Sequence, residues 1–167
     1  EKDLLVLCEA FQRLLQQGAA YHLRIVGDGP LRAYIERFAR LTPHVTYEGL
    51  VPYGPELAAL YAAADVLALP SRNETFGLTI LEALAAGIPV VAANQGGPSN
   101  LLPAHVGALA RPGDAADFAA QLARVLTQRP ASQCCRNYVA QHFSWDKTFV
   151  RLLDIYENLH RHTGVVA

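Results

Sequence analysis

The sequence has 167 residues, of which 51% are hydrophobic and 17% are charged, and its formal net charge is −1. Such a chain is expected to form one globular domain with a sizeable core, over residues 1–167, and this composition excludes an intrinsically disordered protein. The lack of a basic excess argues against a nucleic-acid partner, and no apolar run reaches the length that spans a bilayer.

The cysteines and histidines bear on the redox compartment and on metal binding. Cys8, Cys134 and Cys135 form neither a disulfide framework nor a zinc-ligand spacing, so we expect a reducing, cytoplasmic compartment. The six histidines are scattered or near the end, which favours solvated side chains over metal ligands. The sequence contains no methionine, even at its first position, so we expect a piece of a longer protein.

Hydrophobic periodicity alternates between the helical and the strand period along the first part of the chain. Apolar residues recur at helical spacing from Leu4 to Leu15, and Gly18 is placed to end this helix. In chain order, the predicted elements are a helix at 4–15, a strand at 21–27, a helix at 31–41, a strand near 44–47, a helix at 56–64, a strand at 65–70, a helix at 78–86 and a strand at 89–93. Short strands separated by helices predict a Rossmann-like α/β fold, with a parallel sheet covered by helices on both faces.

From about residue 114 onward the predicted structure is helical, over 114–128, through 134–143 and over 144–162. Near the other end, the GDGP stretch at 27–30 predicts a tight turn that leads into a helix. It is not a dinucleotide-binding fingerprint, because Arg32 occupies the position of the third glycine.

The junction between the strand at 65–70 and the next helix is the candidate ligand site, because ligands of parallel sheets bind at the carboxyl ends of the strands. Pro70 ends the strand, so Ser71 to Phe76 form a loop. Gly77 then allows close backbone approach, and Gly87 ends the following helix. The free amides at the start of this helix favour an anion such as a phosphate.

Two carboxylates stand in this otherwise apolar junction. Glu74 falls in the loop, and Glu82 falls on a helix that is apolar nearly all round. Such a helix is buried, so Glu82 lies near an exposed end or has a hydrogen-bond partner. Taken alone, a glutamate on a helix is more often a solvated helix former.

The spacing of these features resembles the donor-binding signature of retaining GT-B glycosyltransferases, the group 1 nucleotide-sugar family. The resemblance consists of a loop glutamate, Phe-Gly, a second glutamate eight positions after the first, EALAAGIPVVA and GGP. The stretches LRIVGDGPL, VTYEGLV, LAALYAAADVLALPS, GALARPGD and FSWDKTFVRLLDIY agree in order. The match runs from Lys2 to about Tyr156 and corresponds to the C-terminal half of a two-domain enzyme.

The resemblance implies a role for each matching residue. Glu74 would bind hydroxyls of the donor sugar at the catalytic centre, and Glu82 would bind ribose hydroxyls. Lys2 matches a diphosphate-binding lysine whose companion arginine, together with a first strand, precedes it in the family. Asn100 stands where the family tends to show a glutamate.

Backbone groups complete the implied donor site. The base would lie against the loop from Gly49 to Val51. The amides that hold the phosphates and the sugar would belong to Phe76, Gly77, Leu78 and Thr79, and the Thr79 hydroxyl would be an added donor.

The resemblance also implies the chemistry and the partners. The donor substrate would be a nucleoside-diphosphate sugar, and no metal or other cofactor is expected because no DxD pair is present. The acceptor, a sugar or lipid-linked glycan, would bind an N-terminal domain outside this sequence, in the cytoplasm or at the cytoplasmic membrane face. The fragment alone is expected to be inactive.

Two other function classes are compatible with the sequence. One is a related enzyme of the same fold, such as a nucleotide-sugar epimerase or a glycosyl phosphorylase. The other is a non-catalytic Rossmann-like module that binds a protein partner and no nucleotide. The paired glutamates with Phe76 and Gly77 between them favour the sugar transferase.

Overall fold

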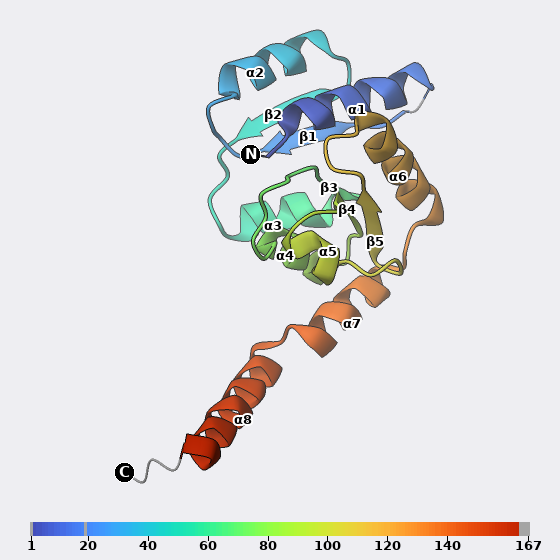
Figure 1. Cartoon of the computed structure of the whole chain (residues 1–167). Helices are drawn as coiled ribbons and strands as arrows, with labels where there is room; N and C mark the ends of the chain where they lie inside the picture. Colours follow the sequence, from blue (N-terminus) through green and yellow to red (C-terminus); the bar gives the residue numbers. More distant parts are fainter. Residues whose placement is uncertain (1, 19, 164–167) are drawn as a thin grey trace.

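The computed structural model describes residues 2–18 and 20–163, with side chains as far as His160. Helices and strands alternate through most of this range (Figure 1). The elements are α1 (Leu4–Gln16), β1 (Leu23–Val26), α2 (Arg32–Leu41), β2 (Val45–Gly49), α3 (Pro55–Ala62), β3 (Leu67–Leu69), α4 (Leu78–Ala86), β4 (Val90–Ala93), α5 (Gly97–Leu101), β5 (Gly107–Ala110), α6 (Ala115–Gln128), α7 (Ser132–His142) and α8 (Trp145–Thr163).

The strands are parallel, as the sequence predicts, but they form two sheets instead of one. In the larger sheet, β4 lies between β3 and β5. The smaller sheet contains β1 and β2, with an irregular register between Ile25 and Val26. The predicted α/β class is therefore confirmed, and the division of the strands is new.

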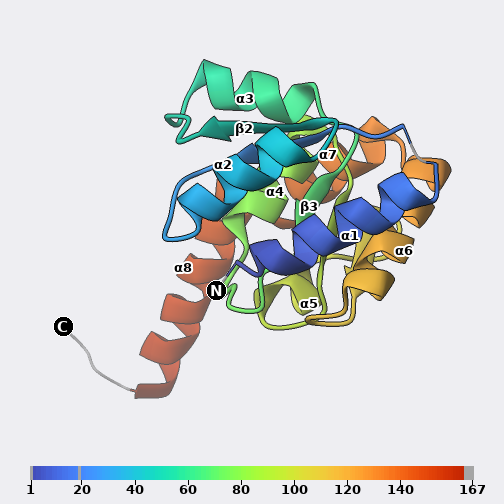
Figure 2. The same cartoon turned by 90° about the horizontal axis from the view of Figure 1, so that it is seen from above.

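Helices cover both faces of the larger sheet. Val91 of β4 points into a core shared with α1, β5 and α6, which includes Leu14 and Phe118. Val90 and Ala92 point the other way, into a core shared with α4 and α7. Seen from above, α1 and α6 lie side by side, and the contacts between these two helices agree with that view (Figure 2). This alternation along one strand explains why β4 is wholly apolar.

The smaller sheet departs from the expectation that both faces are covered. Ile25 of β1 is buried with Cys8 of α1 and Phe38 of α2. Arg24 and Val26, which point the other way, are exposed. At Arg24, Ile25 and Val26, β1 therefore alternates between exposed and buried positions, whereas β2 is half-buried throughout and β4 is wholly buried.

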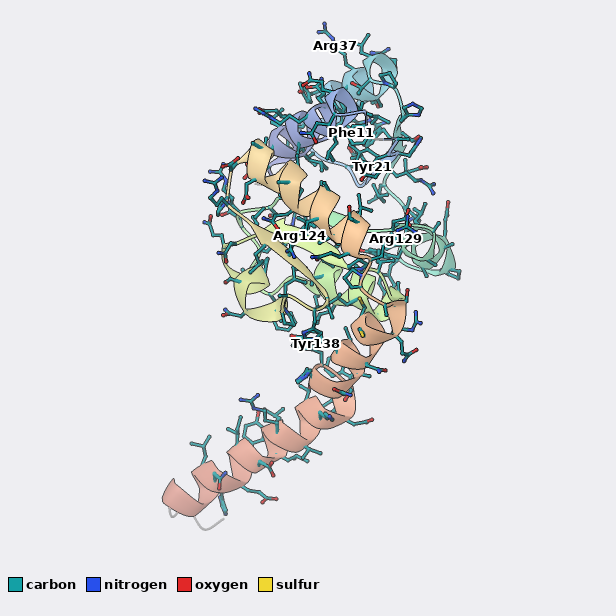
Figure 3. The ribbon with its side chains drawn as sticks, turned by 90° about the vertical axis from the view of Figure 1, so that its right-hand side faces the viewer. Phe11, Tyr21, Arg37, Arg124, Arg129 and Tyr138 are labelled. Carbon is teal, nitrogen blue, oxygen red and sulfur yellow. The ribbon has the colours of Figure 1, made fainter. Side chains whose placement is uncertain are left out.

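A cavity of about 500 Å³ lies between the two sheets. Its walls include Leu23 of β1, Leu67 of β3 and Leu7 of α1, together with Phe11 and Tyr21, which are labelled in Figure 3. Within the described residues, β1 pairs only with β2, and β3 pairs only with β4. One edge of β1 and one edge of β3 thus lack a neighbouring strand, and both edges face this cavity, which is called the apolar slot below.

Two short elements were not predicted. One is β5, which consists of Gly107, Ala108, Leu109 and Ala110. The other is α5, whose five residues begin at Gly97. Small residues have low intrinsic strand propensity, so β5 depends on its pairing with β4.

The last helix lies away from the rest of the molecule (Figures 1 and 3). It carries a series of exposed apolar side chains: Trp145, Phe149, Val150, Leu152, Leu153, Ile155, Tyr156 and Leu159. No helix in the described part of the chain combines the length and the apolar character needed to cross a membrane.

Candidate functional site

The loop that carries Glu74 follows β3, as predicted, and leads into α4. Gly77 caps the amino end of α4 at φ 91°, and Gly87 caps its carboxyl end at the same φ. This left-handed conformation is open to glycine and costs other residues energy. The two glycines therefore fix both limits of the helix that carries Glu82.

A second pair of glycines lies directly beneath the Glu74 loop. The Gly97 amide donates a hydrogen bond to the Glu74 carbonyl oxygen at 2.9 Å. A Cβ atom on Gly97 would lie 2.6 Å from the Phe76 carbonyl oxygen, and one on Gly96 would lie 2.5 Å from that of Glu74. The GGP stretch thus lets two backbones touch, and this contact holds the loop in place.

The Glu74 side chain is nearly buried, with 12% of its surface exposed, and it forms an ion pair with Lys2. Beside it, Arg72 forms an ion pair with Asp3, whose carboxylate accepts a second hydrogen bond from the guanidinium at 3.0 Å. These two pairs bind the start of α1 to the loop after β3. The structure therefore brings together Lys2 and Glu74, which are 72 positions apart.

The residues expected to donate backbone amides form the entry to α4. Phe76 and Leu78 are exposed, Thr79 is partly exposed, and Gly77 is buried. Amides in the first turn of a helix have no acceptor within it, so they can bind an anion. The Phe76 ring meets Phe143 edge to face, with ring centres 6.4 Å apart. Phe143 ends α7, and its contribution to this loop was not foreseen.

Glu82 has the partner that its place on an apolar helix requires. The Tyr61 hydroxyl donates a hydrogen bond to Glu82 Oε2 at 3.0 Å. Burial chiefly raises the pKa of Tyr61, and the hydrogen bond to Glu82 raises it further, so this phenol remains a donor. Tyr61 lies on α3 and was not predicted as part of the site.

The loop expected to hold the base follows β2 in the smaller sheet. Gly49 has a φ of 69°, and the half-buried Val51 follows two residues later. Among the described residues, no hydrogen bond or ion pair joins Val51 to Glu74, Glu82 or Lys2. The exposed Asn100, on α5, likewise makes no side-chain hydrogen bond in that part of the chain.

Metal binding and thiol chemistry can be judged from the side chains that the structure describes. In the described part of the chain, no group of three or more histidine, cysteine, aspartate or glutamate residues could hold a metal ion. Cys8 and Cys135 are buried thiols, and burial raises the pKa of each. Cys8 packs with Ile25 and Phe38, and Cys135 packs in the core beside α4.

The fold and the site together define a Rossmann-like α/β domain with Glu74 in the loop that follows a parallel strand and Glu82 on the next helix. Residues 1–128 match the model of the family described as glycosyl transferases group 1. The chain belongs to this family. Its fold is the one found in GT-B glycosyltransferases, and it is consistent with the C-terminal domain of such an enzyme.

Two relatives illustrate the likeness at the level of sequence. The chain is 36% identical over 133 residues to the sulfoquinovosyl transferase SQD2 of Arabidopsis thaliana, covering 77% of this chain and 25% of the relative. It is 34% identical over 149 residues to a GDP-mannose-dependent alpha-(1-6)-phosphatidylinositol dimannoside mannosyltransferase of Mycobacterium tuberculosis, covering 87% of this chain and 38% of the relative.

A solved structure shows the same arrangement of elements. The sucrose-phosphate synthase of Thermosynechococcus elongatus superposes with a TM-score of 0.73 at 27% identity, covering 93% of this chain and 42% of the other. The chain thus spans 25% to 42% of the lengths of these three proteins.

Proposed function

We propose that this chain is the donor-binding half of a retaining glycosyltransferase. In this proposal a hexosyl unit moves from a nucleoside-diphosphate sugar to an acceptor hydroxyl without a metal ion. The observation that carries the proposal is the meeting of Lys2 and Glu74 beside the amino end of α4. A cation, a carboxylate and free helix amides are the groups that a sugar diphosphate needs.

Each group has a distinct role in the proposed reaction. Lys2 and the amides of α4 stabilise the diphosphate as negative charge develops on it, and this electrostatic stabilisation is the main catalytic contribution. Glu74 accepts hydrogen bonds from sugar hydroxyls, and Glu82 accepts them from the ribose. The acceptor hydroxyl attacks from the face on which the diphosphate departs, so no protein nucleophile is needed.

Other groups of the site would bind the phosphates, the sugar and the base. The Thr79 hydroxyl adds a donor for the sugar or the phosphates, next to the amides of Phe76, Gly77 and Leu78. The base lies against the loop that ends at Val51. The name of the mycobacterial relative, a GDP-mannose-dependent mannosyltransferase, supports a nucleotide-sugar donor.

The proposal places the acceptor site in another domain of a longer protein. Two surfaces of this chain support that division: the apolar slot between the sheets and the exposed apolar face of α8. A strand that precedes Lys2 would fit between β1 and β3, since both edges face the slot. The protein would act in the cytoplasm or at the cytoplasmic face of a membrane, on a sugar or lipid-linked glycan.

Calorimetric titration of UDP, GDP and their sugars into a protein that contains this chain tests the donor. We expect one base to bind clearly better than the other, and chelation of divalent metals to leave that affinity unchanged. Absence of binding for all four ligands would contradict the proposal and would favour a protein-interaction module.

A second assay separates transfer from related chemistry. Donor alone would be consumed by an epimerase, whereas a transferase needs the acceptor as well, and a phosphorylase needs phosphate. We expect the 167-residue chain to fold, to bind nucleotide weakly and to transfer no sugar, because closure of two domains cannot exclude water from its site. Acceptor-dependent turnover by this chain would overturn the division of roles.

A further inference from the structure

Tyr61 connects two parts of the candidate donor site, the helix after the loop expected to hold the base and the helix that carries Glu82. It lies in the last turn of α3, the helix that follows the loop ending at Val51. Its ring packs against the core cluster that contains Ile80, Ala83 and Leu84 of α4. Its hydroxyl reaches Glu82 on the same helix, 21 positions further along the chain.

The geometry of this contact fixes the direction of the hydrogen bond. A carboxylate only accepts, so the phenol donates its single hydrogen to Glu82 Oε2, over 3.0 Å. In the part of the chain that the structure describes, Glu82 Oε1 accepts no hydrogen bond. Each carboxylate oxygen has two lone pairs, so both oxygens can still accept from a ligand.

We propose that Tyr61 is a positioning residue for nucleotide recognition, which holds the Glu82 carboxylate in the orientation that receives both hydroxyls of a ribose. A glutamate side chain has three rotatable bonds and loses entropy when a ligand fixes it. The packed Tyr61 ring provides that order before the ligand arrives. This inference rests on the proposed role of Glu82.

The placement of α3 adds a second consequence. The start of α3 follows the loop expected to hold the base, and the end of α3 holds Glu82 through Tyr61. Tyr53, two residues beyond that loop, is close enough to Tyr61 to contribute to its raised pKa. One short helix therefore sets the spacing between the base and the ribose.

The experiment compares Tyr61→Phe with Tyr138→Phe by NMR titration of the 167-residue chain, which measures weak affinities. The two tyrosines form a matched pair, because both rings pack against the same core cluster and both hydroxyls donate at 3.0 Å. The acceptor for Tyr138 is the backbone carbonyl oxygen of Leu101, so its loss removes a structural hydrogen bond only.

The readout is the ratio of affinities for ribonucleoside and 2′-deoxyribonucleoside diphosphates, with UDP or GDP and the matching deoxy compound as probes. Tyr61→Phe should weaken binding of the ribo form about three- to tenfold and weaken the deoxy form, which keeps only the 3′-hydroxyl, by less, so the ratio falls towards one. Tyr138→Phe should keep the wild-type ratio, even where it lowers the melting temperature equally.

Glu82→Gln distinguishes failure of this inference from failure of the proposed function. If Glu82→Gln lowers the ratio and Tyr61→Phe does not, Tyr61 is structural only, and the inference is wrong while the ribose role stands. If Glu82→Gln leaves the ratio unchanged, both fail. In the double variant, Tyr61→Phe should cost no further affinity, since the partner it orients is altered, and additive losses would overturn the inference.

Discussion

Glu74 and Glu82 lie in one stretch of chain, but the structure holds them in different ways. Glu82 is on a regular helix, and its partner Tyr61 is a packed ring on a neighbouring helix. Glu74 is in a loop, and its partner Lys2 is a flexible side chain that is 59% exposed. An ion pair with an exposed lysine opens readily and weakens in salt, whereas a packed donor keeps its place.

This difference agrees with the two proposed roles. The ribose is a constant part of any nucleotide donor, so a carboxylate held in one orientation suits it. In the proposed reaction the sugar and the diphosphate separate, so the groups around them must exchange partners. Lys2 can leave Glu74 for a phosphate, and Glu74 can then accept hydrogen bonds from the sugar.

The largest expected effect separates catalysis from binding at Glu74. Glu74→Ala in a full-length enzyme that contains this chain should lower transfer about a hundredfold or more, because misplacement of the reacting sugar carries such a cost. Affinity for the bare nucleoside diphosphate should stay nearly unchanged. Calorimetry and an activity assay must therefore disagree, and equal losses in both would assign Glu74 to the nucleotide or to folding.

Glu82 should show the opposite pattern. Glu82→Ala removes hydrogen bonds to a charged acceptor, so affinity for the nucleoside diphosphate should fall about tenfold or more while the fold is retained. Calorimetry measures the affinity, and circular dichroism checks the fold. An unchanged affinity in a folded variant would end the assignment of Glu82 to the ribose.

Local chemistry explains how far the sequence could predict this region. Gly77 and Gly87 mark the ends of α4, and this alone places Glu74 in a loop and Glu82 on a helix. The hydroxyl that meets Glu82 could not be predicted, because Tyr61 is 21 positions away and reaches it only through the packing of α3 on α4. Periodicity carries no information on such contacts.

The fold was predictable to the same extent. Alternating periods predicted the parallel α/β class, but β5, built of glycine, alanine and leucine, has no strand signal of its own. The division into two sheets also lay beyond the sequence, because pairing depends on which strand edges meet in space. The contact beneath the Glu74 loop is similar, since GGP indicates a turn but not the backbone it will touch.

A substitution at Gly97 should disturb the loop that carries Glu74 and leave the contact between Glu82 and Tyr61 in place. Gly97→Ala places a Cβ 2.6 Å from the Phe76 carbonyl oxygen, so the loop or α5 must move, at a cost of about 1 to 3 kcal/mol of unfolding free energy. Gly29→Ala is the matched control, because no atom lies within 4 Å of its added Cβ. Urea unfolding compares the two variants. Equal stabilities would show that the loop does not depend on this contact.

The smallest expected effect concerns Lys2. Because its ion pair with Glu74 is exposed, we expect Lys2 to be dispensable for folding. An exposed ion pair contributes about 0 to 1 kcal/mol to stability, so Lys2→Gln should barely change the urea midpoint. Affinity for a nucleoside diphosphate should fall about three- to tenfold in low salt, whereas affinity for the nucleoside without phosphates should not change. Because salt screens an exposed cation, the difference between wild type and variant should shrink as ionic strength rises. A loss that is equal for nucleoside and diphosphate would instead place Lys2 among the residues that only hold the Glu74 loop.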